Sequence, residues 1–486
     1  MIKQGFQPSN SLFRANDIRG VALGESATLT PEFAFHLGQA FGTFLWDLWE
    51  NDSSEKPPSP IWLCRDARLS SPDLHAKLLE GLLKAGVDVI DLGIGPTPLI
   101  CHATATSPEP YELAKSGIMI TASHNPSDHN GFKIIVNNKP FFGDDLLSLR
   151  DVITAGHYHQ GDGTLRHYDH QPAYIADLQS RVQNLSESGK PPKIVVDAAN
   201  GAAGVLATQS LEAVGAEVMP LFCEMDGRFP NHSPDTSDPE NLAELVKQVK
   251  LTNAFCGIAL DGDGDRMVAV TETGKILNAD ELMALFCIDV LNNNSSACIV
   301  FDVKTSIQLT RFISGRGGHP MMTKSGRSHI QSAMQSQKAS LAGEFSCHFF
   351  FGDRWHGSDD GIYAAARLLE ICHKLDQPLS QVATNLDTTH ATDEIGIPVS
   401  DERKFGLVQE FATNAKFDGA NLVTIDGLRI EYPTSWALVR ASNTSAKLTL
   451  RFEADSQTEL HELMSLVRQQ LENLEPTLDL RKLNVS

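Results

Sequence analysis

The stretch CGIALDGDGDR, residues 256–266, contains the pattern that decides the fold class. It begins with a short apolar run of the kind that forms a buried β-strand, and an acidic residue follows where the strand would end. The runs KIVVD at 193–197 and CIVFD at 298–302 have the same form. Because open α/β sheets bind ligands at the carboxyl ends of their strands, this repeated pattern predicts related sheets along the chain.

Further apolar runs extend the pattern toward the N-terminus. They are PIWLCRD at 60–66, VDVIDLGI at 87–94 and SGIMITAS at 116–123, and helical patterns separate them. This alternation is typical of βαβ units with buried, largely parallel strands. We therefore predict an α/β fold built from three related α/β domains with mixed, mostly parallel sheets.

The C-terminal part of the chain has a different pattern. The segments NLVTIDGLRIEYP, SWALVRAS and AKLTLRFEA each have the form of a strand, and the helical segment QTELHELMSLVRQQLENL follows them. We expect a small α+β domain here. With polar stretches as boundaries, the predicted domains cover residues 1–168, 169–275, 276–387 and 388–486.

Composition and charge exclude several classes of protein. A chain of 486 residues is long enough for three or four domains. Its net charge of −21 argues against nucleic-acid binding, which needs a concentrated Lys/Arg surface. The N-terminal segment lacks the apolar core of a signal peptide, and no run approaches the roughly 18 apolar residues of a membrane span. We therefore expect a cytoplasmic location and no membrane partner.

The loop from Asp261 to Arg266 has the composition of a metal site. Asp261, Asp263 and Asp265 alternate with glycines, so the three carboxylates can turn toward one hard cation such as Mg²⁺. An EF-hand is disfavoured because Arg266 stands where that loop needs glycine. A second possibility stays open: Asp261 could be the nucleophile of a phosphatase with a D-x-D motif.

The segment TASHNP, residues 121–126, follows an apolar run and places Ser123 on a loop at a strand's end. The neighbouring Asn and Pro predict a rigid turn, which suits an exposed nucleophile or phosphoryl carrier. A capping serine in an ordinary turn is the competing interpretation of this segment alone.

Two further loops carry groups that bind sugars and phosphates. In GEFSCH, residues 343–348, Glu344 and Ser346 can face one side and bind a pair of sugar hydroxyls. In RASNT, residues 440–444, a guanidinium and several neutral donors could form a phosphate cradle, although this segment alone favours a Ser/Asn turn with a solvated Arg. The chain has no P-loop and no dinucleotide glycine motif, so we expect chemistry without ATP or NAD.

Taken in order, these segments resemble the α-D-phosphohexomutase superfamily, and most closely its bacterial phosphomannomutase/phosphoglucomutase group. The resemblance extends over essentially the whole chain and implies four domains around a central cleft. It also includes the following segments: FRANDIRG at 13–20, CRDARLS at 64–70, GPTP at 95–98, DAANGAAG at 197–204, FPNHSPDTSDPENL at 229–242 and RWHGSDDGIYAAARLLE at 354–370.

The resemblance assigns catalytic roles residue by residue. Ser123 resembles the phosphoserine of the family, and its phosphate would complete a magnesium site with Asp261, Asp263 and Asp265. Lys133, Arg19 and Arg266 are implied to stabilise the moving phosphoryl group or to assist proton movement. His124 and Asn125, beside Ser123, are the other implied catalytic residues.

The resemblance also implies a substrate site. Glu344 and Ser346 would bind sugar hydroxyls, and the clamp on the phosphate that is not reacting would consist of Arg440, Ser442, Asn443 and Thr444. Further implied substrate contacts are Lys304, Arg327 and His348.

The implied activity is the interconversion of hexose 1-phosphate and hexose 6-phosphate, with mannose or glucose as the sugar, through a hexose 1,6-bisphosphate. Mg²⁺ is the implied cofactor, and glucose or mannose 1,6-bisphosphate the implied activator. The partners are then small hexose phosphates, and the oligomeric state is left open, with a monomer among the possibilities. Two other classes of function are compatible with parts of the sequence: a Mg²⁺-dependent sugar phosphatase that uses Asp261, and a catalytically silent sugar-phosphate binder.

The sequence departs from the family pattern at four positions. Asn16 stands where these mutases often have Tyr, Cys347 where the sugar loop usually has Gly, and Ala446 where the phosphate loop often has Pro. Arg327 stands where relatives often have His, and this larger cation affects which sugar we expect to fit.

Overall fold

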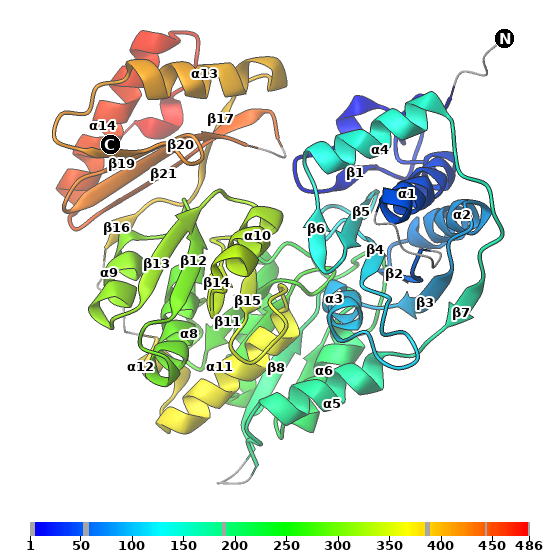
Figure 1. Ribbon diagram of the computed structural model, residues 1–486. Helices are drawn as coiled ribbons and strands as arrows, with labels where there is room; N and C mark the ends of the chain where they lie inside the picture. Colours follow the sequence, from blue (N-terminus) through cyan, green and yellow to red (C-terminus); the bar gives the residue numbers. More distant parts are fainter. Residues whose placement is uncertain (1–4, 52–57, 187–190, 384–388, 443–444, 485–486) are drawn as a thin grey trace.

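The computed structural model describes residues 5–51, 58–186, 191–383, 389–442 and 445–484. Within these residues the chain forms four successive β-sheets with helices around them. The sheets follow one another in an arc, from the N-terminal domain on the right through the lower middle to the C-terminal domain at the upper left (Figure 1). The predicted class, three α/β domains followed by an α+β domain, is confirmed.

The first sheet has seven strands in the order β1-β5-β4-β2-β3-β7, with β6 beside β5. Strands β4, β2, β3 and β7 run parallel, whereas β1 and β5 are antiparallel to their neighbours. The elements of this domain are β1 (Ile18–Val21), α1 (Pro31–Asn51), β2 (Ile61–Arg65), α2 (Ser71–Lys84), β3 (Val89–Ile94), α3 (Thr97–Thr106), β4 (Ser116–Ile120), β5 (His129–Val136), β6 (Lys139–Phe141), α4 (Asp144–Ala155) and β7 (Leu165–His167).

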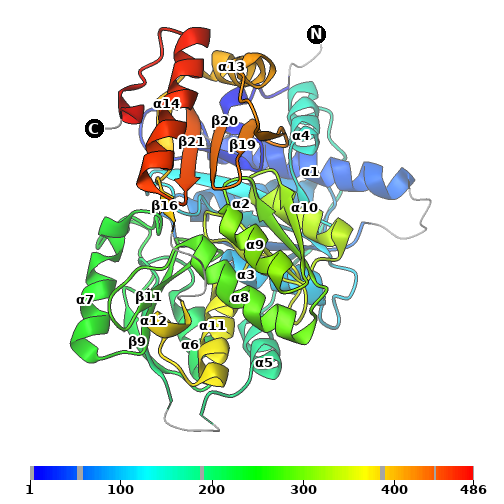
Figure 2. The ribbon, with the colours of Figure 1, turned by 90° about the vertical axis from the view of Figure 1, so that its left-hand side faces the viewer.

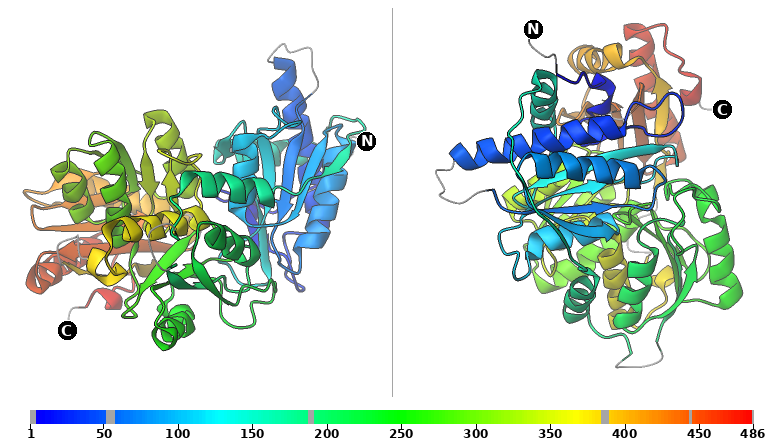
Figure 3. Two further views of the ribbon diagram at one scale, coloured as in Figure 1. Left: turned by 90° about the horizontal axis from the view of Figure 1, so that it is seen from below. Right: turned by 90° about the vertical axis from the view of Figure 1, so that its right-hand side faces the viewer.

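Strand β2 shows why this sheet has continuous apolar runs. Ile61 and Leu63 belong to the core beneath α1 and α2, while Trp62 and Cys64 belong to the core beneath α3 on the opposite face. Both faces of the strand are therefore buried, as in other parallel sheets. The right-hand view of Figure 3 shows α1 and α2 running side by side along this domain.

The second and third sheets repeat one plan. Their orders are β11-β10-β8-β9 and β13-β12-β14-β15, and in each of them three parallel strands carry an antiparallel strand at one edge. The elements of the second domain are α5 (Gln171–Arg181), β8 (Lys193–Asp197), α6 (Gly204–Ala213), β9 (Glu217–Leu221), α7 (Ala243–Thr252), β10 (Cys256–Leu260) and β11 (Met267–Thr271). Those of the third are α8 (Ala279–Asn293), β12 (Cys298–Asp302), α9 (Ile307–Gly315), β13 (His319–Thr323), α10 (Arg327–Gln337), β14 (Leu341–Gly343), β15 (Phe349–Phe351), α11 (Gly361–Leu375) and α12 (Leu379–Val382).

This shared plan positions the loops singled out in the sequence. The Ser123 loop joins β4 to the antiparallel β5, the aspartate loop joins β10 to the antiparallel β11, and the Glu344 loop joins β14 to the antiparallel β15. Each of these loops leaves the carboxyl end of a strand that pairs in parallel with another neighbour. The three loops thus occupy equivalent places in three related sheets.

The fourth domain is an antiparallel sheet in the order β16-β21-β20-β19-β18, with β17 also paired to β21. Its elements are β16 (His390–Ala391), β17 (Ile395–Pro398), α13 (Asp401–Asn414), β18 (Asn421–Val423), β19 (Leu428–Glu431), β20 (Ser435–Ala441), β21 (Lys447–Ala454) and α14 (Gln457–Leu474). Figure 2 shows α14 lying along β20 and β21.

One predicted strand of the fourth domain is two strands in the structure. The segment NLVTIDGLRIEYP forms β18 and β19, which pair as a hairpin. Asp426-Gly427 lies in the connecting turn, and Gly427 has a φ of +78°. Glycine adopts this left-handed conformation readily, so the D-G pair is the turn signal that separates the strands.

The cores distinguish the fourth domain from the rest. One continuous core extends through all three α/β domains and includes Trp62, Leu206 and Phe286. The fourth domain has its own core, in which Phe411 and Phe452 pack. In the part of the chain that the structure describes, no helix combines the length and apolar composition needed to cross a membrane.

Candidate active site

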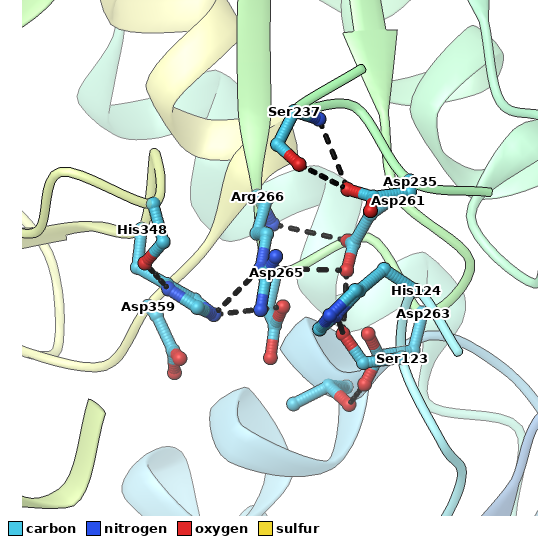
Figure 4. A network of polar contacts seen from close by, with 12 residues as sticks. Ser123, His124, Asp235, Ser237, Asp261, Asp263, Asp265, Arg266, His348 and Asp359 are labelled. Atoms are coloured by element: carbon cyan, nitrogen blue, oxygen red, sulfur yellow. Dashed lines mark hydrogen bonds and ion pairs between the residues drawn. The ribbon is translucent and has the colours of Figure 1, made fainter. Parts of the chain in front are cut away.

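The Ser123 loop is held in a strained turn by buried donors. Ser123 has a φ of +52°, which is unusual for a residue with a side chain, and its amide donates to Thr121 Oγ1 over 3.0 Å. Its hydroxyl is almost fully buried and donates to Asp261 Oδ2 over 2.6 Å. The serine and the aspartate loop therefore meet directly, as Figure 4 shows.

Arg68 fixes the backbone of this loop, and the sequence analysis gave it no role. Its buried guanidinium donates to the carbonyls of Ser123 and Asn125 over 2.8 and 2.7 Å, and also to those of Pro126 and His129. Asp66 accepts from the Arg68 Nε over 3.1 Å. The segment CRDARLS was the only signal in the sequence that could have indicated this arginine.

The aspartate loop packs so closely against the serine loop that one glycine is obligatory. A Cβ at Gly262 would lie 2.4 Å from the carbonyl oxygen of Ser123. Gly264 has a φ of +74°, and a Cβ there would lie 2.6 Å from Ala203. The glycines thus allow the loop both its curvature and its contact with the serine.

Lys133 on β5 is the cation that reaches into the aspartate loop. Its Nζ donates to Asp263 Oδ2 over 2.6 Å and also to Asp265 Oδ2. Burial acts to lower the pKa of Lys133, but the two carboxylates raise it above its usual value, so the side chain stays charged. These two ion pairs link the first domain to the second.

The three aspartates fit a divalent cation. They are fully buried, and their carboxylate oxygens lie within 4.8 Å of one another. Among the described residues, none donates to Asp263 Oδ1. Burial and the other two carboxylates raise the pKa of Asp261, which is the response of a buried anion without enough positive charge around it. An all-oxygen donor set of this kind suits a hard cation.

Other predicted residues surround the serine. Arg19 on β1 donates to Asn125 Oδ1 over 3.1 Å, and His124 Nδ1 lies 3.3 Å from Ser123 Oγ. Burial, together with Arg266 and Arg19, lowers the pKa of His124 well below its ordinary value. The Arg266 Nε lies 3.8 Å from Asp261 Oδ2. The loop is thus enclosed by cationic and neutral donors.

The Glu344 loop joins the same network through His348. His348 Nε2 lies 3.3 Å from Asp265 Oδ1, and its Nδ1 lies 2.9 Å from Glu344 Oε2. Burial acts to lower the pKa of His348, but Asp265 and the hydrogen bond with Glu344 raise it to about 9. Ser346 Oγ lies 3.0 Å from His348 Nδ1. The main chain adds a direct link, because the Met267 amide donates to the Cys347 carbonyl over 3.1 Å.

Three of the residues that differ from the family pattern, Cys347, Asn16 and Arg327, are closely constrained by their surroundings. Cys347 has a φ of +65°, which explains why a glycine would be the easier residue there. Asn16 lies against Gly326, where a Cβ would come within 2.9 Å of its side chain. Arg327 forms a two-bond ion pair with Asp359, and its Nε lies 3.9 Å from Asp265 Oδ2.

The phosphate-loop residues lie on the fourth domain, at its contact with the third. Arg440 on β20 donates to Asp426 Oδ2 over 3.0 Å, and the same oxygen accepts from the Ser325 amide. Ser442 Oγ accepts from the Ser445 amide over 3.2 Å. Asn443 and Thr444, the other two predicted clamp residues, lie outside the described residues.

Lys304 is engaged by the fourth domain. Its Nζ lies 2.8 Å from Glu394 Oε1 and 3.7 Å from Asp302 Oδ2. Nothing in the sequence indicated Glu394, which is ninety positions away. Lys304 therefore lies between the third and fourth domains rather than in the serine pocket.

A buried serine hydroxyl beside three carboxylates, with Lys133, Arg19 and Arg266 nearby, is a constellation for phosphoryl transfer. The fold and this site together define a multidomain α/β enzyme of that chemistry. Comparison with known proteins narrows the class.

Family models for phosphoglucomutase/phosphomannomutase match the chain in four successive segments. Alpha/beta/alpha domains I, II and III match residues 10–157, 172–274 and 278–389, and the C-terminal domain matches residues 394–470. The chain belongs to the phosphoglucomutase/phosphomannomutase family, and it is therefore an isomerase.

Individual relatives are similar in sequence to this chain over nearly its full length. The phosphomannomutase/phosphoglucomutase of Pseudomonas aeruginosa is 42% identical over 96% of this chain and 97% of its own. The phosphoglucomutase of Neisseria gonorrhoeae is 39% identical, with the same coverage. The crystal structure of a phosphoglucomutase/phosphomannomutase family protein from Burkholderia thailandensis, 39% identical, superposes with a TM-score of 0.89 over 97% of this chain and 99% of that one.

Proposed function

We propose that this protein is a phosphohexomutase that interconverts the 1-phosphates and 6-phosphates of mannose and glucose through a phosphoserine at Ser123. The observation that carries the proposal is the buried hydrogen bond of 2.6 Å from the Ser123 hydroxyl to Asp261 in the three-carboxylate loop. Relatives named for both sugars, at 42% and 39% identity, support the substrate class. The substrates are metabolites of the cell interior, which favours a cytoplasmic location.

In the first half-reaction a phosphoryl group leaves Ser123 Oγ for the free hydroxyl of a hexose phosphate. The P–O bond to the serine breaks, a P–O bond to the sugar forms, and the proton of the sugar hydroxyl ends on the serine oxygen. Asp261, Asp263 and Asp265 would hold Mg²⁺, which supplies positive charge to the phosphoryl oxygens when bound. Lys133, Arg19 and Arg266 stabilise the charge on the moving group or assist the proton transfer.

The product of this step is a hexose 1,6-bisphosphate, which must turn before its other phosphate returns to Ser123. Glu344 and Ser346 bind hydroxyls of the sugar in both orientations, with Arg327 and His348 beside them. The distal phosphate is held by Lys304 and by the loop that contains Arg440, Ser442, Asn443 and Thr444. Added glucose or mannose 1,6-bisphosphate would act as an activator, since it rephosphorylates a bare serine.

The test measures conversion of mannose 1-phosphate and glucose 1-phosphate with Mg²⁺ and a trace of glucose 1,6-bisphosphate, recording hexose 6-phosphate and free phosphate together. Wild type is compared with Ser123→Ala and with Ser210→Ala, a buried serine in α6, as the matched control. We expect isomerisation without phosphate release, abolished only in Ser123→Ala. Free phosphate that persists in Ser123→Ala would overturn the proposal in favour of a phosphatase that uses Asp261.

A further inference from the structure

Three side chains from three different domains meet away from the serine pocket. His102 lies on α3, Asp177 on α5, and His356 in the segment before α11. His102 Nε2 is 3.1 Å from Asp177 Oδ2, and His356 Nε2 is 2.7 Å from the same oxygen. Helices α3 and α5 lie in contact in the lower right part of Figure 1. None of these residues belongs to the aspartate loop or to the proposed substrate site.

The donor atoms match a borderline transition metal rather than magnesium. Two imidazole nitrogens and one carboxylate oxygen lie within 4.8 Å of one another. Zinc binds such ligands at about 2.0–2.2 Å in tetrahedral geometry, which separates the ligand atoms by about 3.3 Å. The two imidazole–carboxylate separations, 3.1 and 2.7 Å, would reach that value with outward shifts of a few tenths of an ångström. Magnesium, in contrast, prefers oxygen ligands throughout.

The groups behind these donors orient them as the outer contacts of a metal site do. The other nitrogen of His102, Nδ1, lies 2.7 Å from His170 Nε2, and the other oxygen of Asp177, Oδ1, accepts from Arg181 Nε over 2.7 Å. Such contacts fix the imidazole tautomer and the orientation of the carboxylate, leaving the remaining atoms to face the metal. His170 is almost completely buried, and its Nδ1 has no hydrogen-bond partner among the described residues.

The ionisation states also suit a metal. Burial lowers the pKa of both His102 and His356, so both imidazoles are neutral near pH 7. Burial acts to raise the pKa of Asp177, but hydrogen bonds from His102 and Arg181 lower it, so the carboxylate is charged. Neutral imidazoles and a carboxylate are the forms that bind metal. On binding, each imidazole would shift its proton from Nε2 to Nδ1, and the Nδ1 of His102 then faces His170 Nε2. His356 and Asp177 are partly exposed, which leaves a path for the ion.

We propose that His102, Asp177 and His356 form a zinc site that joins the three α/β domains, with water as the fourth ligand. Each domain contributes one ligand, so the ion would cross-link three segments that are otherwise joined by packing and by hydrogen bonds such as that from the Tyr174 hydroxyl to Asp360. The site is separate from the carboxylate loop in its position, in its donor atoms and in its metal.

The first experiment counts zinc on the full-length protein after dialysis against chelator and re-equilibration with Zn²⁺ in a large excess of Mg²⁺. The excess Mg²⁺ occupies the aspartate loop, which would otherwise take up zinc. We expect wild type to retain about one zinc ion per chain. His356→Gln should retain none, while His75→Gln, which changes a histidine paired with Asp91 elsewhere in the first domain, should behave as wild type. Equal zinc retention in wild type and His356→Gln, or none in wild type, overturns the proposal.

A second measurement does not depend on variants. Co²⁺ replaces Zn²⁺ in wild type, again with excess Mg²⁺, and its visible spectrum and X-ray absorption report the donor set. We expect intense tetrahedral bands and scattering from two imidazoles. A weak six-coordinate spectrum with oxygen ligands alone would contradict the site. Zn²⁺ should also raise the Tm of wild type by several degrees and leave that of His356→Gln unchanged, because the ion binds only the folded three-domain arrangement.

Discussion

The serine pocket and the junction of the fourth domain are built in different ways. In the pocket, main-chain hydrogen bonds cross the domain boundaries: the Thr97 amide donates to the Asp263 carbonyl, and the Gly361 amide donates to the Gly264 carbonyl. A continuous core lies beneath them. At the junction, a small apolar cluster of Val303, Trp436 and Leu438 makes the contact.

Around that cluster the links are made mostly by side chains. Arg429 Nη1 donates to the carbonyls of Val303 and Thr305 over 2.6 and 2.7 Å, and Ser306 Oγ donates to Glu453 over 2.6 Å. Side-chain links can exchange partners, whereas packed main chain cannot shift without unfolding. We therefore expect the pocket to be the fixed part of the active site and the fourth domain to be the part that adapts to each orientation of the bisphosphate.

The largest effect is expected from Lys133→Met, which would remove positive charge from the serine pocket. Two buried carboxylates, Asp263 and Asp265, would lose their ion pair with Lys133, so without Mg²⁺ the protein should be destabilised by about 3–5 kcal/mol. Added Mg²⁺ should restore much of this loss, while kcat/KM stays lower by roughly 10²–10³-fold. Chemical denaturation with and without Mg²⁺, together with steady-state kinetics, measures both. Lys193→Met, where Nζ donates to the Thr252 carbonyl, is the control, and equal losses in both variants would contradict the account.

A purely geometric change in the pocket should come second. Gly262→Ala places a Cβ 2.4 Å from the Ser123 carbonyl, so the serine loop must move. We expect kcat to fall by about 10–100-fold through misplacement of the serine, with about 1–3 kcal/mol of destabilisation. Gly315→Ala at the end of α9 adds a Cβ with no atom of the described chain within 4 Å, and it should leave kcat unchanged. Wild-type kcat in Gly262→Ala would show that the contact is not a constraint.

The junction should respond differently. Arg429→Met removes the donor that holds the carbonyls on both sides of Lys304, so substrate binding suffers more than chemistry. We expect KM to rise by about 10-fold, equivalent to about 1.4 kcal/mol, with kcat changed less than about 3-fold. Arg403→Met in α13 of the same domain, which removes a guanidinium paired with Glu410, is the control. A loss confined to kcat would mean that the junction belongs to the fixed part.

The smallest expected effect is on the pH dependence of stability in the three α/β domains. Burial, with His102 nearby, lowers the pKa of His170 to about 3 in the folded protein, against about 6.5 when unfolded. Below pH 6.5 the unfolded chain therefore binds a proton that the folded protein does not. The folded protein becomes less stable as the pH is lowered. Between pH 7 and 5.5 this group alone should cost about 1.4 kcal/mol. Urea denaturation of wild type and His170→Phe in chelator checks it, since the variant should lose this share of the pH dependence.

Much of this architecture could be predicted from the sequence because its signals are local. The apolar runs that end in Asp197 and Asp261 are neighbouring strands of the second sheet, and the run that ends in Asp302 lies in the third, so the repeated pattern indicated related sheets. The D-G-D-G-D spacing indicated the carboxylate cluster. The Ser123 loop was recognisable from its own turn residues. In each case the residues that act together lie within a few positions of one another.

What escaped prediction depends on contacts between distant parts of the chain. Arg68 supports the serine loop from about sixty positions away, and Glu394 engages Lys304 across a domain boundary. The φ of +65° at Cys347 is set by the hairpin around it and not by its own residue type. The pairing of Arg327 with Asp359 likewise follows from where α10 and the segment before α11 come together. Local patterns carry no information about such partners.

The separate core of the fourth domain makes this domain a transplantable unit. It is covalently joined to the rest of the chain at one end only, and its apolar interior is completed by α13 and α14. A chimera that replaces it with the corresponding domain of a relative would import a new distal loop, provided that the imported domain has an arginine at the position of Arg429 to reach the Val303 and Thr305 carbonyls. Binding of the distal phosphate and phosphoryl-transfer chemistry could then be altered as independent parts of one enzyme.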